Sequence, residues 1–579
     1  MNTGFSLKLI LEYREIFDDK PLSVSEYLKG ISREKMLTVG AHFLGFNNKN
    51  SRFNDHKEFL EMYFCHENNK LANNIYTKIK TIEKNKSREI LILNALTSLQ
   101  LFEFCFENLG KENTQTNAEL EVNLFKAYLL LNQLNTQRDN IASKTTESLE
   151  SEYKLAGLSL AQSFAYSDIA NYDLVEAFTC QLVKAVYLFD FLKSRNDTAK
   201  LCQSFLELFN CKSSDEYLKR IIPLGISIIR NDGEGHLDIN VEADEDYKIN
   251  IEFLDNLVVL DHEPITDIDF RKLRTKPFYK IEKDKYRVIF GLFVIEKIFK
   301  GLYFLLRNVN ATLSKSDKLK DFRSFYCEYF SERTLLYDVL HETYGGRYIE
   351  FSGSQMKESG LEAEPDYYIR RGNYVFLFES KDILINVDVK TSRDYNQIEE
   401  AFKEKFYFEV HDGKKANKAV LQLVNNIKRI LNRELPFDST YKQTSIRIYP
   451  ILVIHDDQYN LSGLNVIINK WFKEEIKNLE DSGVPVDKVH DLTIIDIDTL
   501  IFYQDSFKAR KIKLDKVIDE YHKYIKFDRN KKYRDKEHVH EHIKRTVVPF
   551  SIFLSNYSHS KGFVGVPSIL REKGYSLFQ

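Results

Sequence analysis

The strongest constraint on the fold of this chain is a short apolar run that ends in charged residues. Residues 374–378 read Tyr-Val-Phe-Leu-Phe, and Glu379, Ser380 and Lys381 follow directly. An unbroken apolar run of this length indicates a strand buried on both faces, because a half-exposed strand would alternate with polar residues. Side chains alternate along a strand, so Glu379 and Lys381 point to one face and Ser380 to the other. Charges at the end of a buried strand are costly, which makes this segment the first candidate for a functional site.

A second acid comes within reach of this strand through a predicted hairpin. Asp366 starts a short strand, and Arg371-Gly372-Asn373 is a turn signal that precedes the apolar run. A tight hairpin through that turn places Asp366 beside Glu379. Two neighbouring carboxylates repel unless a cation lies between them, and hard oxygen ligands favour Mg²⁺ or Mn²⁺. With a lysine that orients water and offsets negative charge, these are the parts needed to hydrolyse a phosphodiester.

The segment from Pro365-Asp366 to Glu379-Ser380-Lys381 resembles the active-site motif of the PD-(D/E)XK nuclease superfamily, which has the restriction-endonuclease-like fold. The resemblance covers roughly residues 320 to 505, a plausible size for one domain. It implies a metal-dependent nuclease in which Asp366 and Glu379 bind the ion. It further implies that the carbonyl of Ser380 is a metal ligand and that Lys381 positions the attacking water.

The same resemblance directs attention to two helices. Many members of the superfamily add an acid from a preceding helix, and Glu332 is the candidate on a helix predicted for residues 331–342. Its alternative role is that of a helix N-terminal acid stabilised by the helix dipole. Some branches carry a glutamine on the helix after the triplet, where this chain has Gln422. A solvent-facing helix residue is the alternative for Gln422.

Two alternatives to this catalytic triplet stay open at the level of sequence. Asp388-Val389-Lys390 is also an acid and a lysine at the end of an apolar run. We favour Glu379-Ser380-Lys381, because its spacing from Asp366 fits one tight hairpin and its strand is the more continuously apolar one. The second alternative is an ordinary surface hairpin with ion pairs along its rim.

The segments after the triplet predict the rest of a mixed sheet. Helices are expected at 416–431 and 464–479, and strands at 446–454 and 492–502. Pro450 within the first of these strands suggests a bulge or an edge position, because proline cannot donate to a ladder. Alternation of strands and helices indicates a central sheet with helices on its faces, an α/β/α core.

The amino-terminal part has the periodicity of helices from residue 5 to about 230. Helices are expected at 87–109 and 119–131, with a polar break at 135–148, and from Asp173 to about 192. After an acidic stretch at 231–246 we expect strands at 247–260 and 278–289 and a buried helix at 288–306. The predicted fold class is α+β multidomain, with an all-α domain first. The domains expected are 1–235 (helical), 236–315 (bridging), 316–505 (nuclease core) and 506–579 (a basic extension).

Composition sets the remaining expectations. Six scattered cysteines without a CxxC pair predict a reduced, cytoplasmic protein, and no signal peptide or membrane span is expected. The net charge of −3 gives no global nucleic-acid signature, so DNA contact must be local. Residues 505–545 hold 14 Lys/Arg against 8 Asp/Glu, with aromatic residues such as Phe507 and Tyr521 among them. Such a surface suits phosphate contacts and base stacking, and a solvated helix face is the alternative.

These features predict a Mg²⁺- or Mn²⁺-dependent deoxyribonuclease with DNA as its partner. The helical domain is expected to bind a protein partner or to mediate self-association. A fusion of this kind suits bacterial defence against foreign DNA, by family-level analogy alone. The competing expectations are a non-catalytic nucleic-acid-binding or scaffold protein with a nuclease-like fold, and an RNase of the same fold.

Overall fold

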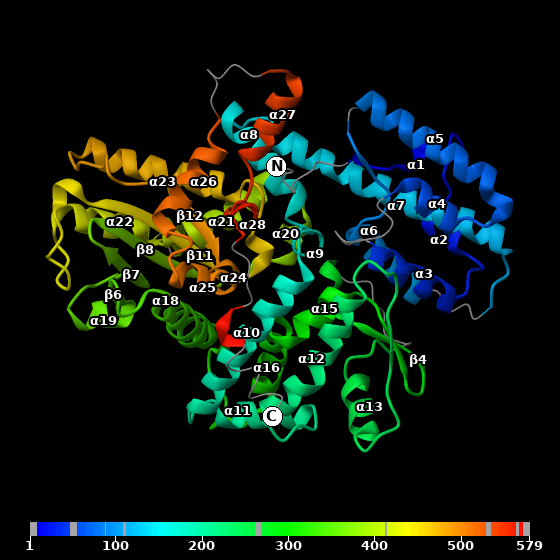
Figure 1. Cartoon of the computed structure of the whole chain (residues 1–579), viewed down its shortest axis with the longest axis horizontal. Coiled ribbons are helices and arrows are strands. Elements are labelled where there is room, and N and C mark those ends of the chain that lie inside the picture. The colour runs from blue at the N-terminus through cyan, green and yellow to red at the C-terminus, as the bar shows by residue number, and fades with distance from the viewer. Residues whose placement is uncertain are drawn as a thin grey trace.

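The computed structural model of this chain describes residues 9–46, 55–86, 88–107, 112–260, 268–411, 414–527, 534–562 and 567–570. Its fold is mixed α+β, and most of the described residues are helical. The amino-terminal helices gather at one end of the molecule, and a five-stranded sheet covered by helices forms the other end (Figure 1). No helix among the described residues has the length and apolar character to cross a membrane.

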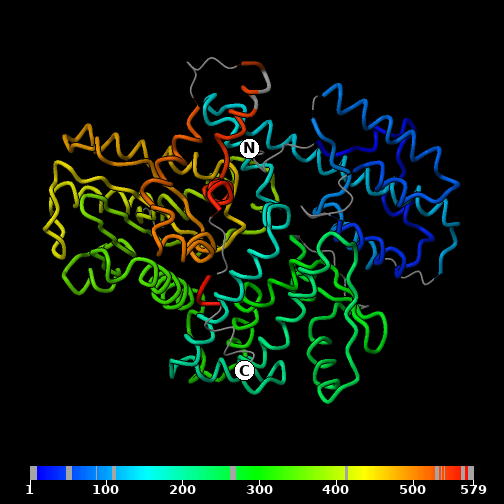
Figure 2. The backbone as a smooth tube through the Cα atoms, in the orientation of Figure 1, coloured from blue at the N-terminus to red at the C-terminus, as the bar shows by residue number. Residues whose placement is uncertain are grey.

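The amino-terminal region is built from α1 (Tyr13–Ile16), α2 (Val24–Leu28), α3 (Arg33–Phe46), α4 (His56–Tyr63), α5 (Asn69–Lys86), α6 (Ala95–Glu107) and α7 (Asn117–Thr145). It is not purely helical, since β1 (Leu9–Ile10) pairs in parallel with β2 (Ile90–Leu91). This pairing explains why α6 begins later than expected. The path of α7 leads from these helices towards the sheet region (Figure 2).

The polar break expected at 135–148 is wrong, because α7 continues to Thr145. Asn135, the first residue of that stretch, is buried and bonded: its Nδ2 donates to Gln100 Oε1 at 2.8 Å and to Thr97 Oγ1 at 3.3 Å. A buried amide that is fully bonded is compatible with a helix interior, so polarity alone did not mark a loop here.

The middle of the chain begins with α8 (Ser151–Ser163) and α10 (Leu174–Ser194). The start of α10 is as expected, because the Asp173 side chain accepts hydrogen bonds from the amides of Val175 and Glu176. Next come α11 (Ala199–Leu208), α12 (Ser214–Arg230) and β3 (Asp238–Asn240). The strand expected at 247–260 is wrong, since α13 (Tyr247–Asp255) is a helix that turns Phe253 and Leu254 into the core.

The expected strand at 278–289 is present as a hairpin of β4 (Phe278–Glu282) and β5 (Lys285–Val288). The single helix expected at 288–306 is divided into α15 (Gly291–Ile295) and α16 (Lys300–Thr312). The division falls where Glu296 and Lys297 are buried, at 6% and 3% exposure. A buried charge needs an ionic partner, and Glu296 pairs with Lys300 at 3.3 Å and with Arg274 at 3.5 Å.

The five-stranded sheet has the order β12-β11-β8-β7-β6. Its strands are β6 (Ile349–Ser352), β7 (Tyr367–Arg371), β8 (Tyr374–Lys381), β11 (Arg447–Ile454) and β12 (Thr493–Asp496). β6, β7 and β8 form an antiparallel meander, whereas β8, β11 and β12 run parallel. The mixed central sheet expected from the sequence is therefore present, although the last strand is short. Residues Ile497–Phe502 form helix α24 instead of continuing it.

Pro450 does not mark an edge or a bulge, because β11 lies between β8 and β12 with continuous pairing to β8. The amide of Ile448 donates to the Lys488 carbonyl on the β12 side. Alternate residues of a strand direct their amides to the same side, so the nitrogen of Pro450 also faces that side. The ladder with β12 starts only at Ile451, paired with Thr493. Proline therefore lies where the neighbouring strand has not yet begun.

Helices cover both faces of the sheet, and alternate strand residues divide between them. Val375 and Leu377 pack towards α8, α21 (Tyr395–Phe406), α22 (Ala419–Asn432) and α23 (Leu464–Asp481). Phe376 and Phe378 pack towards α18 (Tyr337–Tyr344), α26 (Leu514–Ile525) and α28 (Phe550–Lys561). The helices expected at 416–431 and 464–479 are confirmed as α22 and α23. α8, from the amino-terminal half, shares the same core cluster as the sheet.

Candidate functional site

The hairpin of β7 and β8 brings the predicted residues to one place. Its two-residue loop is Gly372-Asn373, and Gly372 has φ +60°, a conformation that glycine adopts without strain. Tyr367 pairs with Phe378, so the next pair in this register is Asp366 opposite Glu379. Opposed residues of an antiparallel pair share a face, and Lys381 shares it as well. The local pattern of the sequence therefore fixed this juxtaposition.

The contacts at the strand ends are short and directed. The amide of Ser380 donates to Asp366 Oδ2 at 2.5 Å, and Lys381 Nζ donates to Glu379 Oε1 at 2.8 Å. Glu379 is 0% exposed. Its second oxygen, Oε2, has no hydrogen-bond partner among the described residues. A fully buried carboxylate oxygen without a partner is costly, so this atom is poised to accept a cation or a proton.

Glu332 joins the cluster from the other side of the strand ends. It lies in a π-helix, Tyr326–Leu336, that runs into α18, so the helix expected from residue 331 exists but begins earlier. π-helical turns often occur at functional sites because the extra residue redirects side chains. The Tyr337 hydroxyl donates to Glu332 Oε1 at 3.1 Å. Glu332 is half-buried and close enough to Asp366 for their charges to repel.

Burial and mutual repulsion raise the pKa of every carboxyl in this cluster. Burial, with Asp366 as the next cause, raises the pKa of Glu379 to about 8. The same two causes raise the pKa of Glu332 to about 7, and burial also raises the pKa of Asp366. Burial opposes the charged form of Lys381, but Glu379 and Asp366 outweigh it and raise the pKa of this amine. Three carboxyls therefore face one ammonium, an imbalance that favours a further cation.

The donor set fits a hard divalent ion. Asp366 and Glu379 supply carboxylate oxygens, and the Ser380 carbonyl belongs to the residue between Glu379 and Lys381. Oxygen ligands of this kind suit Mg²⁺ or Mn²⁺. Nowhere in the described part of the chain do three or more His, Cys, Asp or Glu side chains form a group that could hold a metal ion. An ion here would therefore rest on two carboxylates, backbone oxygen and water, with Glu332 outside the ligand set.

The loop that leads into Asp366 is held from two directions. Ala363 has φ +51°, a left-handed conformation that costs energy for a residue with a Cβ. Asn426 and Arg429 of α22 donate to the Ala363 carbonyl at 3.1 and 3.2 Å and so fix this strained segment. The Gly353 amide donates to the Asp366 carbonyl at 2.8 Å. The position of Asp366 thus depends on α22 and on the segment after β6.

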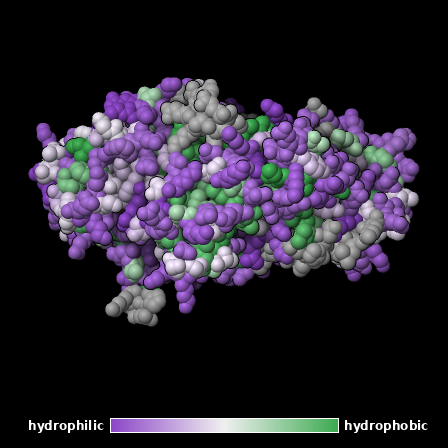
Figure 3. All heavy atoms as spheres, turned by 90° about the horizontal axis from the view of Figure 1, so that it is seen from below, coloured by the Kyte–Doolittle hydropathy of each residue, from purple (hydrophilic) through white to green (hydrophobic). Residues whose placement is uncertain are grey.

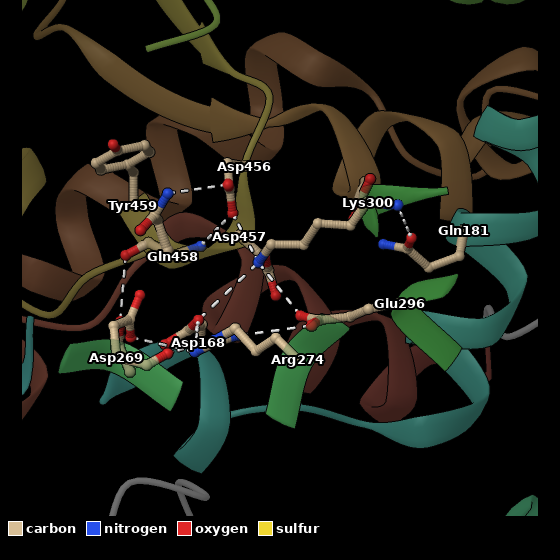
Figure 4. Close-up of polar contacts among 12 residues, drawn as sticks. Asp168, Gln181, Asp269, Arg274, Glu296, Lys300, Asp456, Asp457, Gln458 and Tyr459 are labelled. Atoms are coloured by element: carbon tan, nitrogen blue, oxygen red, sulfur yellow. Dashed lines mark hydrogen bonds and ion pairs between the residues drawn. The ribbon is translucent and has the colours of Figure 1, made fainter. Parts of the chain in front are cut away.

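The rival triplet is excluded by its secondary structure and its partners. Residues Val387–Thr391 form the short helix α20, so Asp388 and Lys390 do not follow a strand. Lys390 is 3% exposed, and its amine pairs with Asp269 at 2.8 Å and with Asp168 at 3.5 Å. Figure 4 shows the ion network around Asp168, which also includes Arg274. Lys390 is therefore a buried structural cation whose ion-pair partners are Asp168 and Asp269, not Asp366.

Gln422 and the aromatic residues of the basic segment were also predicted to contact the site or its substrate. Gln422 is half-buried on α22, and within the described residues no hydrogen bond joins its side chain to the carboxylate cluster. In the basic segment, Phe507 and Tyr521 are 3% and 0% exposed, so the expectation that they stack on bases is wrong. Both rings belong to the core instead. Residues 528–533 of that segment lie outside the described residues.

Sequence reasoning missed His455, which follows β11 directly. The Ser380 hydroxyl and His455 Nε2 are 2.7 Å apart, on the face of the sheet opposite Glu379. Asp382, one residue after the predicted triplet, binds Arg323 at 2.7 Å and the Ser331 hydroxyl at 2.6 Å. A usable signal existed, because parallel strands end at the same edge of a sheet. The residue directly after the strand at 446–454 is therefore expected to lie near the end of β8.

Comparison of the chain with protein-family models, with curated proteins and with solved structures finds no match.

Proposed function

We propose that this protein is a metal-dependent nuclease with a restriction-endonuclease-like core, and that it cuts DNA. The observation that carries the proposal is the convergence of Asp366, Glu379 and Lys381 at the end of a buried strand. The excess of carboxyls over ammonium groups there, and the unpaired Glu379 Oε2, support a divalent ion. Asp366 and Glu379 would hold it, together with the Ser380 carbonyl. When bound, such an ion supplies Lewis-acid stabilisation and lowers the pKa of a water ligand.

The residues of the chain have separable tasks in this proposal. Lys381 stays a cation, and its amine beside Glu379 can orient a water and offset charge that develops on the phosphate. Glu332, with a pKa near 7, can accept or return a proton in the neutral range. Tyr337 holds Glu332 by its hydroxyl, and burial excludes bulk water from Glu379. The task of Lys381 is the one that the superfamily resemblance implies, whereas those of Glu332 and Tyr337 rest on their contacts in this chain.

The compartment, the partners and the biological role of the protein are also part of the proposal. Each of the six cysteines is a free thiol, which agrees with a reducing compartment, and we place the protein in the cytoplasm. The amino-terminal helices are proposed to bind a protein partner or a second copy of the chain. A role in bacterial defence against foreign DNA rests on the superfamily analogy alone.

A cleavage assay with purified full-length protein tests the proposal. Plasmid DNA, single-stranded DNA and RNA are incubated with Mg²⁺, with Ca²⁺ and with EDTA. We expect Mg²⁺-dependent cleavage of DNA that Lys381→Ala abolishes, while Lys428→Ala, a change of an exposed lysine on α22, leaves it unchanged. Cleavage of RNA alone would favour the RNase alternative. Binding of nucleic acid without cleavage under any metal condition would favour the non-catalytic alternative.

A further inference from the structure

A cavity of about 60 Å³ lies beside the ends of β8 and β11, next to the candidate catalytic residues. Ser331, Asp382 and His455 are among its lining residues. Ser331 precedes Glu332, and Asp382 follows Lys381 in the chain. His455 is bonded to the Ser380 hydroxyl, on the face of the sheet opposite Glu379. His455, which lines the cavity, therefore contacts a residue whose carbonyl is a proposed metal ligand.

His455 presents an unused polar atom at this cavity. Its side chain is 9% exposed, and Nε2 is engaged with Ser380. Nδ1 has no hydrogen-bond partner among the described residues. In a neutral imidazole Nδ1 is either a single donor or a single acceptor, and Nε2 takes the other role. A buried polar atom without a partner indicates that something else normally bonds to it.

Carboxylates outnumber cations around the cavity, since Asp456 also lines it and lies 3.0 Å from Lys300, and this limits what it can hold. Three cations line it, and each is paired with a carboxylate at the distances that follow: Lys184 with Asp498 at 2.7 Å, Lys300 with Asp457 at 2.8 Å, and Arg323 with Asp382 at 2.7 Å. Figure 4 shows the Lys300 amine directed at its acidic partners. An anion such as a phosphate would have to compete with these carboxylates. A neutral ligand that carries both donors and acceptors suits the lining better.

The rim of the cavity is apolar and exposed. Phe304 of α16 is 46% exposed and Leu384 is 39% exposed, although both line the cavity. Tyr303 is adjacent, and its ring lies under the Arg323 guanidinium at 5.1 Å. Seen from below, the surface has a hydrophobic area near its middle with hydrophilic residues around it (Figure 3). The exposed ring of Phe304 beside a polar interior suits a flat heterocycle that stacks on one side and forms hydrogen bonds at its edge.

We propose that this cavity takes the polar edge of one unpaired nucleobase of the strand that is cut, and that the ring of this base stacks on Phe304 at the rim. This inference rests on the proposed function. The carboxylates can accept hydrogen bonds from an exocyclic amine, and His455 Nδ1 can bond to a ring nitrogen or a carbonyl. A base can enter only if it is already unpaired or is turned out of a duplex, which requires energy to break stacking. The site therefore favours single-stranded DNA, or DNA whose pairing is weakened near the cut.

A positional scan with modified oligonucleotides tests the base site. Full-length protein cleaves a single-stranded oligonucleotide in Mg²⁺ while one abasic nucleotide is moved through the positions around the cut. We expect one position at which loss of the base lowers kcat/KM about tenfold or more, because a stacked base contributes that much to binding. Phe304→Ala should remove this dependence and cut the abasic and intact strands equally. Phe304→Trp should restore it, and Leu208→Ala, which changes an equally exposed apolar residue on α11, should leave it intact.

Several results would overturn the assignment. Cleavage by the wild-type protein that depends on no single base excludes a base site at the cut. The same dependence in Phe304→Ala as in wild type would place the site elsewhere. Binding of free nucleoside monophosphates at micromolar concentration, with displacement of the oligonucleotide, would make a free nucleotide the occupant and exclude the strand.

A second measurement separates failure of this inference from failure of the proposed function. If the protein cleaves nucleic acid under no metal condition, the proposed function fails. The base site is then tested by oligonucleotide binding alone. An oligonucleotide with 2-aminopurine at one position is titrated with protein in Ca²⁺. An emission change at a single position that Phe304→Ala abolishes supports the base site. An emission that is unchanged at every position refutes it.

Discussion

Replacement of the buried carboxyl by its neutral isostere, Glu379→Gln, should change how the stability of the nuclease region depends on pH. In the folded chain the pKa of Glu379 is about 8, whereas an unfolded glutamate has its ordinary value of 4.5. Between these two values the folded state binds a proton that the unfolded state has released. The free energy of unfolding therefore falls as pH rises from about 4.5 to about 8 and is level above that. The stabilisation by this proton is complete at low pH and is lost at high pH.

The size of the effect follows from the pKa of Glu379. Between pH 6 and about 8 the folded state keeps a proton that the unfolded state has released, and each pH unit of this span lowers the free energy of unfolding by about 1.4 kcal/mol, so wild type should lose roughly 3 kcal/mol by pH 9. Glutamine cannot ionise, and Glu379→Gln should lack this loss. Glu332 contributes with the same sign in both proteins, so the difference between the two proteins isolates Glu379. At pH 9, Mg²⁺ should restore wild type and leave the variant unchanged, because the variant lacks one of the two carboxylates.

The single tryptophan of the chain makes the measurement selective. Trp471 is 2% exposed on α23, in the core cluster that covers the Glu379 face of the sheet. It stacks on Tyr407 with 5.8 Å between ring centroids. Its emission during urea unfolding therefore reports on this region rather than on the amino-terminal helices. The reasoning is refuted if Glu379→Gln loses as much stability between pH 6 and pH 9 as wild type, or if Mg²⁺ stabilises both proteins equally.

The remaining predictions separate the two lysines and probe the support of Asp366. Lys381→Ala should abolish cleavage and leave urea unfolding nearly unchanged in Mg²⁺. Lys390→Ala should keep the wild-type cleavage rate below its melting point but lose about 3–5 kcal/mol of stability, because Asp168 would be left as a buried, less compensated charge. The opposite pattern would favour Asp388-Val389-Lys390 as the catalytic triplet. Gly353→Ala would set a methyl group 2.8 Å from the Tyr337 hydroxyl. Movement of that ring should lower kcat with little change in KM, and a cleavage rate equal to wild type would show that the tyrosine does not position the site.

The sequence by itself determined the features that depend on near neighbours. The Gly372-Asn373 turn and the period of two along each strand set the register of β7 and β8, and this register alone puts Asp366 opposite Glu379. The 3.6-residue periods of α22 and α23 were also readable, because each helix turns one apolar stripe to the sheet. Turn geometry and periodicity act over a few residues, so one segment carries all the information they need.

The tertiary structure decided which groups meet across long stretches of chain. Lys390 resembled a catalytic lysine in sequence, but it is neutralised by Asp168 and Asp269, which come from a distant part of the chain. Pro450 is tolerated inside the sheet only because β12 starts beyond it. His455 reaches Ser380 because two parallel strands end together. The partner of a buried charge or a strand amide is selected by the packing of the whole molecule, and no local pattern carries that choice.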